Sequence, residues 1–385
     1  MVTNNMEART KQRVFLSVFF FLSGFCFSTW ASRIPTIKEA FHFSDAQLAT
    51  VLIFMPVGSL IGLPISRWLV SRFDSRVPLA FAAVMLAISL TLIGLSTATV
   101  FLFGAVCLFA FNMRILNISM NVQSVTLQKQ FERRISGSFH GLWSTGGIIG
   151  VGFSTLLIAL NVPMIYHMVI VAVVTTAITA FSFSSLVRND RTPSERKVDL
   201  GNPDPYIVYL GLIVFFASIC EGGMFDWSGV YFKDIVHAEL FTLGYLCFMI
   251  FMAFSRFASD AIIERIGVEK IFMISATCII AGIALAVVFP FFWTALLGFC
   301  LVGYGSAAIM PVVISLAGAS RKYSPGTAIS IVITYNIVGV FVGPPVIGYV
   351  AQISSLRFSF IIFALSGLMF IPISKLFFRH QRLIK

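Results

Sequence analysis

The sequence predicts an all-α membrane protein with twelve transmembrane helices in two pseudo-symmetric six-helix bundles. Three observations support this fold class: the composition, the number of long apolar runs, and a weak internal repeat. Of the 385 residues, 58% are hydrophobic and only 11% are charged, with 41 Phe. Soluble domains carry about 25% charged residues, which they need to cover their surface. The composition therefore excludes a water-soluble domain and indicates a chain whose solvent is the lipid bilayer.

The apolar runs of the first half divide into six spans, since a helix needs about 20 residues to cross the hydrocarbon core. Two long uncharged runs are too long for one crossing, and short polar turns at 97–99 and 161–163 divide them. The first of these divisions places Arg114 inside the fourth span. The expected spans are the runs 14–32 and 46–66, then two spans from each of the stretches 77–113 and 135–187.

A polar break at 188–205, RNDRTPSERKVDLGNPDP, lies at the midpoint of the chain and predicts a cytosolic linker. It divides the chain into an N-terminal six-helix bundle, 1–187, and a C-terminal six-helix bundle, 206–385. The expected spans of the second bundle are 206–230, 240–256, 268–289, 293–318, 326–350 and 357–377.

The basic residues predict the orientation, because Lys and Arg near the ends of spans are retained on the cytoplasmic side. With both termini in the cytoplasm, 22 of the 27 Lys and Arg residues fall on the inner side. The net charge of +11 is thereby explained, and it is scattered over short loops. Nucleic-acid binding would require those residues to cluster on one soluble face, so no nucleic-acid partner is expected.

An internal repeat supports two bundles of the same build. A shift of 193 residues roughly superposes six spans on six. It places Arg72 on Arg265, Gly146 on Gly339 and Gly150 on Gly343. Two parallel six-helix repeats are typical of transporters whose solute site lies near the midplane, where the repeats meet.

The loop RWLVSRFDSR at 67–76 resembles the loop pattern Gly-x-Leu-x-Asp-Arg-x-Gly-x-Arg of the major facilitator superfamily. It keeps Leu69, Arg72 and Arg76, whereas Ser71 stands where the pattern has Asp. The resemblance implies a latch that holds the cytoplasmic ends of the two halves together. Its residues would be Arg72, Arg76, Arg256, Asp260 and Arg265.

Three segments, 111–128, 138–150 and 221–232, are similar to the fucose-permease-like branch of this superfamily, a branch of bacterial inner-membrane proteins. The fourth span of that branch tends to have an acidic residue where this chain has Asn117, and no Arg at the position of Arg114. A proton-coupling role at Asn117 is therefore not implied.

Arg114 is the strongest candidate for a solute-binding residue, because an ionisable side chain deep in a span usually faces the bundle interior or an aqueous cavity. Asn117 and Asn121 follow at i+3 and i+7, on the same helical face. A guanidinium and two amides suit an anionic or hydroxyl-rich solute. The alternative is a structural ion pair between Arg114 and an acid, of which Glu221 and Asp226 are the leading candidates.

Glu221 and Asp226 in the seventh span are the candidates for proton coupling, since a carboxyl group in a membrane can bind and release the coupled proton. Gly222 and Gly223 between them would allow a turn to unwind. Asp226 is equally compatible with pairing to Arg33 or Lys233. Further candidates for the solute site are His140 and Trp143 in the fifth span and Tyr335 and Asn336 in the eleventh.

The function expected from these residues and the resemblance is secondary active transport by alternating access, with proton-linked uptake of a sugar, a sugar acid or a related small solute. Efflux of metabolites or drugs by proton antiport is the alternative, and a membrane receptor or lipid-handling enzyme is a third hypothesis. No nucleotide-binding, catalytic or metal-binding motif is present, so we expect no enzyme, no cofactor and no metal. The expected partners are the solute, a proton and membrane lipid, with a monomeric chain in the bacterial cytoplasmic membrane.

Overall fold

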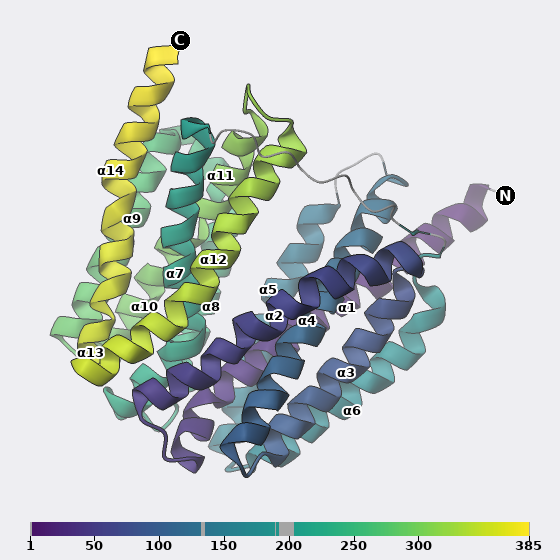
Figure 1. Cartoon of the computed structure of the whole chain (residues 1–385), viewed down its shortest axis with the longest axis horizontal. Helices are drawn as coiled ribbons and strands as arrows, with labels where there is room; N and C mark the ends of the chain where they lie inside the picture. Colours follow the sequence, from purple (N-terminus) through teal and green to yellow (C-terminus); the bar gives the residue numbers. More distant parts are fainter. Residues whose placement is uncertain (1, 132–134, 189, 192–203, 385) are drawn as a thin grey trace. The chain divides into compact units, whose positions relative to one another are not determined.

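The computed structural model describes residues 2–131, 135–188, 190–191 and 204–384, and those residues are almost entirely helical (Figure 1). The first half contains α1 (Val2–Ala40), α2 (Asp45–Arg72), α3 (Arg76–Leu95), α4 (Thr99–Gln128), α5 (Ser136–Ala159), α6 (Met164–Ser182) and the short 3₁₀ helix η1 (Phe183–Ser185). The second half contains α7 (Pro205–Asp234), α8 (Thr242–Ile266), α9 (Val268–Val288), α10 (Phe292–Ala307), α11 (Ile309–Gly318), α12 (Pro325–Ile353), α13 (Leu356–Ser359) and α14 (Ile361–Ile384).

The helices of the described chain provide the twelve spans that the sequence predicts. Eleven are long and apolar enough to cross a membrane, and Thr242–Arg256 of α8 adds a shorter apolar helix. Helices α10 and α11 together form one span, Phe292–Gly318. They are separated at Ala308 because Pro311 has no N–H group and its ring clashes with the carbonyl group four residues earlier, that of Ala307.

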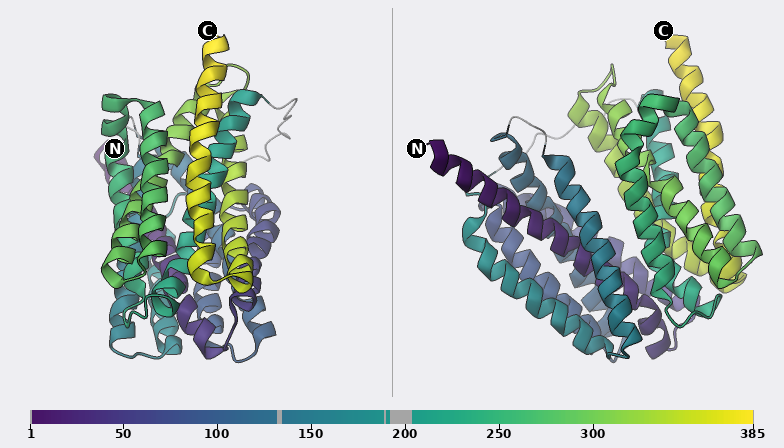
Figure 2. Two further views of the ribbon diagram at one scale, coloured as in Figure 1. Left: turned by 90° about the vertical axis from the view of Figure 1, so that its left-hand side faces the viewer. Right: turned by 180° about the vertical axis from the view of Figure 1, so that it is seen from behind.

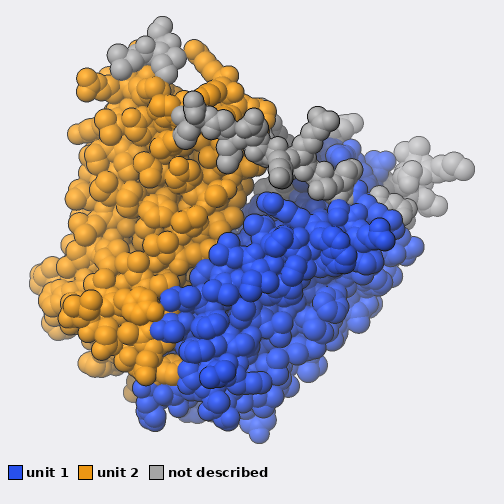
Figure 3. All heavy atoms as spheres, in the orientation of Figure 1, with its two compact units in different colours: residues 1–42, 50–196 blue, residues 43–49, 197–385 orange. Residues whose placement is uncertain are grey.

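The chain forms two compact units, which Figure 3 colours separately. Unit 1 comprises residues 1–42 and 50–196, and unit 2 comprises 43–49 and 197–385. The predicted linker at 188–205 lies mostly outside the described residues.

Equivalent helices pack together in the two units. In unit 1, α1 packs against α5, and α3 packs against both α4 and α6. In unit 2, α7 packs against α12, and α9 packs against both α10 and α14. The two views of Figure 2, taken with Figure 1, show α3 and α6 of unit 1 running side by side. Since α12 and α14 are the fifth and sixth spans of their half, the same order of contacts is repeated.

The glycines that the sequence repeat superposes lie at equivalent helix contacts. A Cβ atom on Gly146 of α5 would overlap the carbonyl oxygen of Phe21 of α1, and one on Gly339 of α12 would overlap that of Phe215 of α7. One turn later, Gly150 and Gly343 face α1 and α7 in the same way. In each unit a glycine seam therefore lets two helices approach backbone to backbone, which is a common use of small residues in membrane helices.

Candidate solute-binding site

Arg114 lies near the middle of the 30-residue helix α4 and is half-buried. Its Nε donates a hydrogen bond of 2.7 Å to Ser59 Oγ on α2. Gly62, one turn along α2, leaves room for the aliphatic part of the arginine, since a Cβ atom there would lie 3.1 Å from Arg114 Cβ. Among the described residues no acid pairs with Arg114, so its positive charge is held by a neutral hydroxyl group.

The polar stripe predicted on α4 is graded in exposure. Asn117 is half-buried, as Arg114 is, whereas Asn121 is exposed. The stripe therefore runs from within unit 1 to its surface. Its members differ in donors and acceptors: the guanidinium only donates, whereas each amide can donate and accept.

Glu221 of α7 forms an ion pair with Arg256 of α8, in which Arg256 Nη2 lies 2.8 Å from Glu221 Oε1. The expected spans placed Arg256 at the inner end of the eighth span. Helix α8 instead extends ten residues further, to Ile266, so Arg256 lies near its middle. Similarly, α7 continues to Asp234, which places Glu221 near the middle of that helix. The structure thus brings one predicted coupling residue together with one predicted latch residue.

Asp226 is buried in unit 2, and its Oδ1 has no hydrogen-bond partner among the described residues. The expected unwinding at Gly222 and Gly223 does not occur, because α7 is continuous through both. These glycines instead accommodate neighbours: a Cβ atom on Gly222 would lie 2.8 Å from the carbonyl oxygen of Val340, and one on Gly223 would overlap the ring of Phe363. Glu221 and Asp226 therefore point in different directions around a regular helix.

Asn336 of α12 joins the polar residues of α7. Ser218, one turn before Glu221, donates a 2.9 Å hydrogen bond from its hydroxyl group to Asn336 Oδ1. The neighbouring Tyr335 is half-buried, and its ring lies against Gly211 of α7. Ser218 and Asn336 thus form a polar contact beside the Glu221–Arg256 pair, whereas Tyr335 packs further along α7.

His140 and Trp143 of α5 lie beside aromatic residues of α1. The exposed His140 contacts Phe20 edge to face, with ring centroids 5.7 Å apart. The half-buried Trp143 lies 6.1 Å from Phe27 between ring centroids. Both belong to unit 1, and they are one turn apart on the helix that carries the glycine seam.

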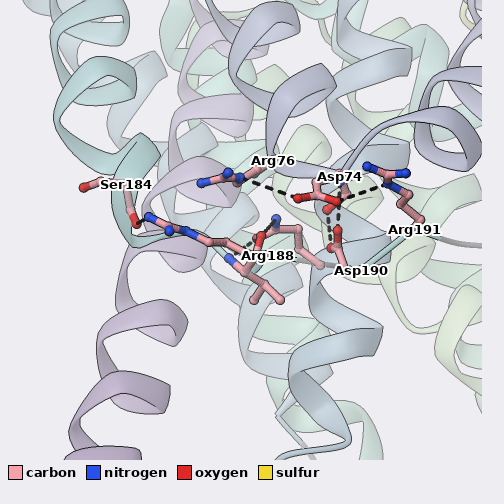
Figure 4. A network of polar contacts seen from close by, with 9 residues as sticks. Asp74, Arg76, Ser184, Arg188, Asp190 and Arg191 are labelled. Carbon is pink, nitrogen blue, oxygen red and sulfur yellow. Dashed lines mark hydrogen bonds and ion pairs between the residues drawn. The ribbon is translucent and has the colours of Figure 1, made fainter.

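The loop expected to form the latch holds an ion cluster within unit 1 (Figure 4). Asp74 lies 4.0 Å from Arg76 and 3.4 Å from Arg191, and the guanidinium of Arg76 also lies over the ring of Phe183. Arg72 is exposed. In the second half Arg265 is exposed, and the side chain of Asp260 lies outside the described residues.

Residues 186–191 are bound to unit 1 by two buried polar side chains, and we call this segment the clasp. Gln123 of α4 donates to the carbonyl of Val187 at 3.1 Å and accepts from its N–H at 3.2 Å. Asp190 accepts from both the N–H and the hydroxyl group of Ser75, the residue before α3 (Figure 4). A carboxylate is favourable there because helix N-termini carry partial positive charge.

Arg33 and His167 form a buried polar pair that the sequence reasoning did not find. Arg33 Nε donates to His167 Nδ1 at 3.0 Å, and Arg33 Nη2 donates to the carbonyl of Val162 at 3.0 Å. Arg33 is thus engaged within unit 1 and does not pair with Asp226. Lys233, the other cation considered for Asp226, lies over the ring of Phe241. The signal available in the sequence was a histidine inside an uncharged span.

Proteins of known sequence provide relatives along almost the whole chain. An uncharacterized MFS-type transporter of Yersinia pestis is 28% identical over 351 residues, which are 91% of each chain. An uncharacterized transporter of Sinorhizobium fredii is 28% identical and covers 90% of this chain and 93% of its own. Membrane protein MosC of Rhizobium meliloti is 27% identical over 94% of this chain and 89% of its own.

Solved structures show the same fold at low sequence identity. The nucleoside transporter NupG superposes with a TM-score of 0.74 at 14% identity, covering 95% of this chain and 100% of its own. A bacterial homolog of the human lysosomal transporter Spinster, in an inward-facing and unoccupied conformation, gives a TM-score of 0.75 at 14% identity over 97% of each chain.

The repeated six-helix packing and the charged residues at mid-helix define an integral membrane protein of the transporter class. The family model of the Major Facilitator Superfamily matches residues 14–322 and 247–383, so the chain belongs to this superfamily. It is a secondary transporter of a small-molecule solute and not an enzyme.

Proposed function

We propose that the protein moves a small polar or anionic solute, such as a sugar or sugar acid, across the bacterial cytoplasmic membrane together with a proton. The observation that carries this proposal is the uncompensated cation Arg114 near the middle of α4, held by Ser59. A positive charge at this depth is costly unless it serves a pathway or a ligand. An anionic or hydroxyl-rich solute supplies the acceptors that this site lacks.

In this proposal Arg114 binds the negative or hydroxyl-rich part of the solute, and Asn117 and Asn121 orient it. His140, Trp143, Tyr335 and Asn336 are further candidates for solute contact. Glu221 carries the proton, because it is half-buried near the middle of α7 and paired with a residue that can release it. The same role is open to Asp226, which is buried deeper and has an unpartnered oxygen.

The proposal extends to orientation and assembly. The distribution of Lys and Arg favours cytoplasmic termini and a cytoplasmic position for the clasp and the loop at 67–76. The predicted latch between halves and the place in the fucose-permease-like branch remain part of the proposal, as does a monomeric state.

The test is proton movement in proteoliposomes that contain the purified protein. Neutral sugars and the corresponding sugar acids are added outside, and the internal pH is recorded. We expect acidification with one class of solute and its loss in Glu221→Gln, with Asp226→Asn measured in parallel. Solute accumulation without proton entry would contradict proton symport, and proton release on loading from the inside would favour efflux by antiport.

A further inference from the structure

We propose that Arg256 is a second solute-binding residue and that a carboxylate of the solute takes the place of Glu221 on its guanidinium. This inference rests on the proposed transport function and deepens it, because it names a carboxylate as the recognised group. Glu221 is then an internal stand-in for the solute, which keeps Arg256 paired while the site is empty.

The geometry of the pair supports an exchange of partners. Arg256 Nη2 and Glu221 Oε1 lie 2.8 Å apart, and the two side chains are 30% and 17% exposed. Neither is sealed in the core of unit 2, in contrast to Asp226 on the same helix, which is 8% exposed. A pair that keeps this much exposure can be reached by a second carboxylate, whereas breaking a fully buried pair would leave an uncompensated charge.

The chemistry of the two partners makes the exchange specific. A guanidinium offers five N–H donors in a fixed fork that matches a carboxylate, so Arg256 holds a solute carboxylate as it holds Glu221. Of the helices packed against α7, α11 and α12 have no charged residue, and the basic residues of α14 begin only at Lys375. Ser218 and Asn336 lie one turn away, where they offer polar groups to the remainder of the solute.

The exchange predicts opposite effects for the two members of the pair. Removing the charge of Glu221 removes the internal competitor and strengthens carboxylate binding, whereas removing Arg256 abolishes it. A purely structural ion pair would not give this opposition, because loss of either partner would then weaken binding or leave it unchanged.

The experiment measures thermal unfolding of the purified full chain in detergent, because a ligand that binds the folded state raises the melting temperature. The probes are two matched pairs, D-glucuronate with D-glucose and D-gluconate with D-glucitol. We expect only the acids to stabilise the native protein. In Glu221→Gln the same stabilisation should appear at about tenfold lower concentration, the effect of one charge-assisted hydrogen bond.

The double variant Arg256→Gln, Glu221→Gln provides the loss of function. It removes both charges and keeps the side-chain volumes, so it leaves no unpaired ion and should fold. We expect it to show no response to either acid while retaining its helical circular dichroism and its elution volume.

Three results would overturn the inference: an undiminished response to the acids in the double variant, equal acid concentrations for the native protein and Glu221→Gln, or no response to either acid in both proteins. Stabilisation by D-glucose or D-glucitol alone would also overturn it, but would leave the proposed transport function standing.

Discussion

The two units share a scaffold but differ in how they hold charge near the middle of their helices. In both, paired glycines let the fifth helix of the half approach the first, at Gly146 and Gly150 in unit 1 and at Gly339 and Gly343 in unit 2. In unit 1 the cation Arg114 rests on a neutral serine, whereas in unit 2 Arg256 is paired with an acid.

This difference separates what packing requires from what a solute requires. Backbone contact between helices has one geometric solution, the absence of a side chain, so both units use glycine at equivalent positions. The charged residues have no such constraint. Unit 1 keeps a net positive charge at mid-helix, whereas the pair in unit 2 is neutral, so the two units are suited to different parts of the solute and of the coupling ion.

The largest effect is expected from Arg114→Gln, which would remove the positive charge that distinguishes unit 1. Loss of a partly buried charged hydrogen-bonding group costs about 2–5 kcal/mol of binding free energy, so the apparent solute affinity should fall about 30-fold or more. Solute-dependent proton entry into proteoliposomes is the measurement.

Arg114→Lys sharpens this test, because it keeps the charge and removes the planar fork. It should retain part of the affinity for an acidic solute. Unchanged affinity in Arg114→Gln would show that the two units do not differ in the way described, and that Arg114 has a structural role.

A second effect tests the shared scaffold. Gly146→Ala and Gly339→Ala each place a methyl group on a backbone carbonyl of the neighbouring helix, and overpacking of this kind costs about 1–3 kcal/mol. Both variants should therefore melt several degrees below the native protein in detergent, and by similar amounts.

The matched control is Gly152→Ala on α5, because no atom lies within 4 Å of a Cβ atom built at Gly152. Alanine in a helix is more favourable than glycine by about 1 kcal/mol, so this variant should be as stable as the native protein or more so. A destabilised Gly152→Ala, or a tolerated Gly339→Ala, would break the equivalence of the two seams.

The smallest effect is expected from Ser59→Ala, which removes the hydroxyl group that holds Arg114. One hydrogen bond to a partly exposed charged group is worth about 1 kcal/mol net, so solute affinity should change about fivefold. Ser119→Ala on α4 is the control, since this buried hydroxyl has no hydrogen-bond partner among the described residues and should be silent. A larger loss than that of Arg114→Gln would reverse the roles assigned here.

The fold was predictable because its signals are local or repeated. Uncharged runs of about 20 residues identify membrane helices, and the superposed glycines mark a seam that recurs 193 residues later. Helix ends were less predictable. Both α7 and α8 continue through polar residues beyond the apolar run, which moved Glu221 and Arg256 to mid-helix.

The partners of the charged residues were not predictable from the sequence. Arg114 meets a serine 55 positions away, and Arg33 meets a histidine 134 positions away. Serine and histidine are common residues whose one-letter symbols do not distinguish a hydrogen-bond partner from a lipid-facing or core residue. Pairing by opposite charge therefore suggested Glu221 or Asp226 for these arginines, whereas the structure provides neutral acceptors for both.

The clasp determines where the gene can be divided for producing the two halves as separate polypeptides. A cut after Arg191 leaves Asp190 on Ser75 and Val187 on Gln123, so the first fragment keeps the buried hydrogen bonds that close its end. A cut before Leu186 transfers both to the wrong fragment and leaves the amide of Gln123 without its backbone partner. Co-expression of the two fragments should therefore restore transport only with the later cut.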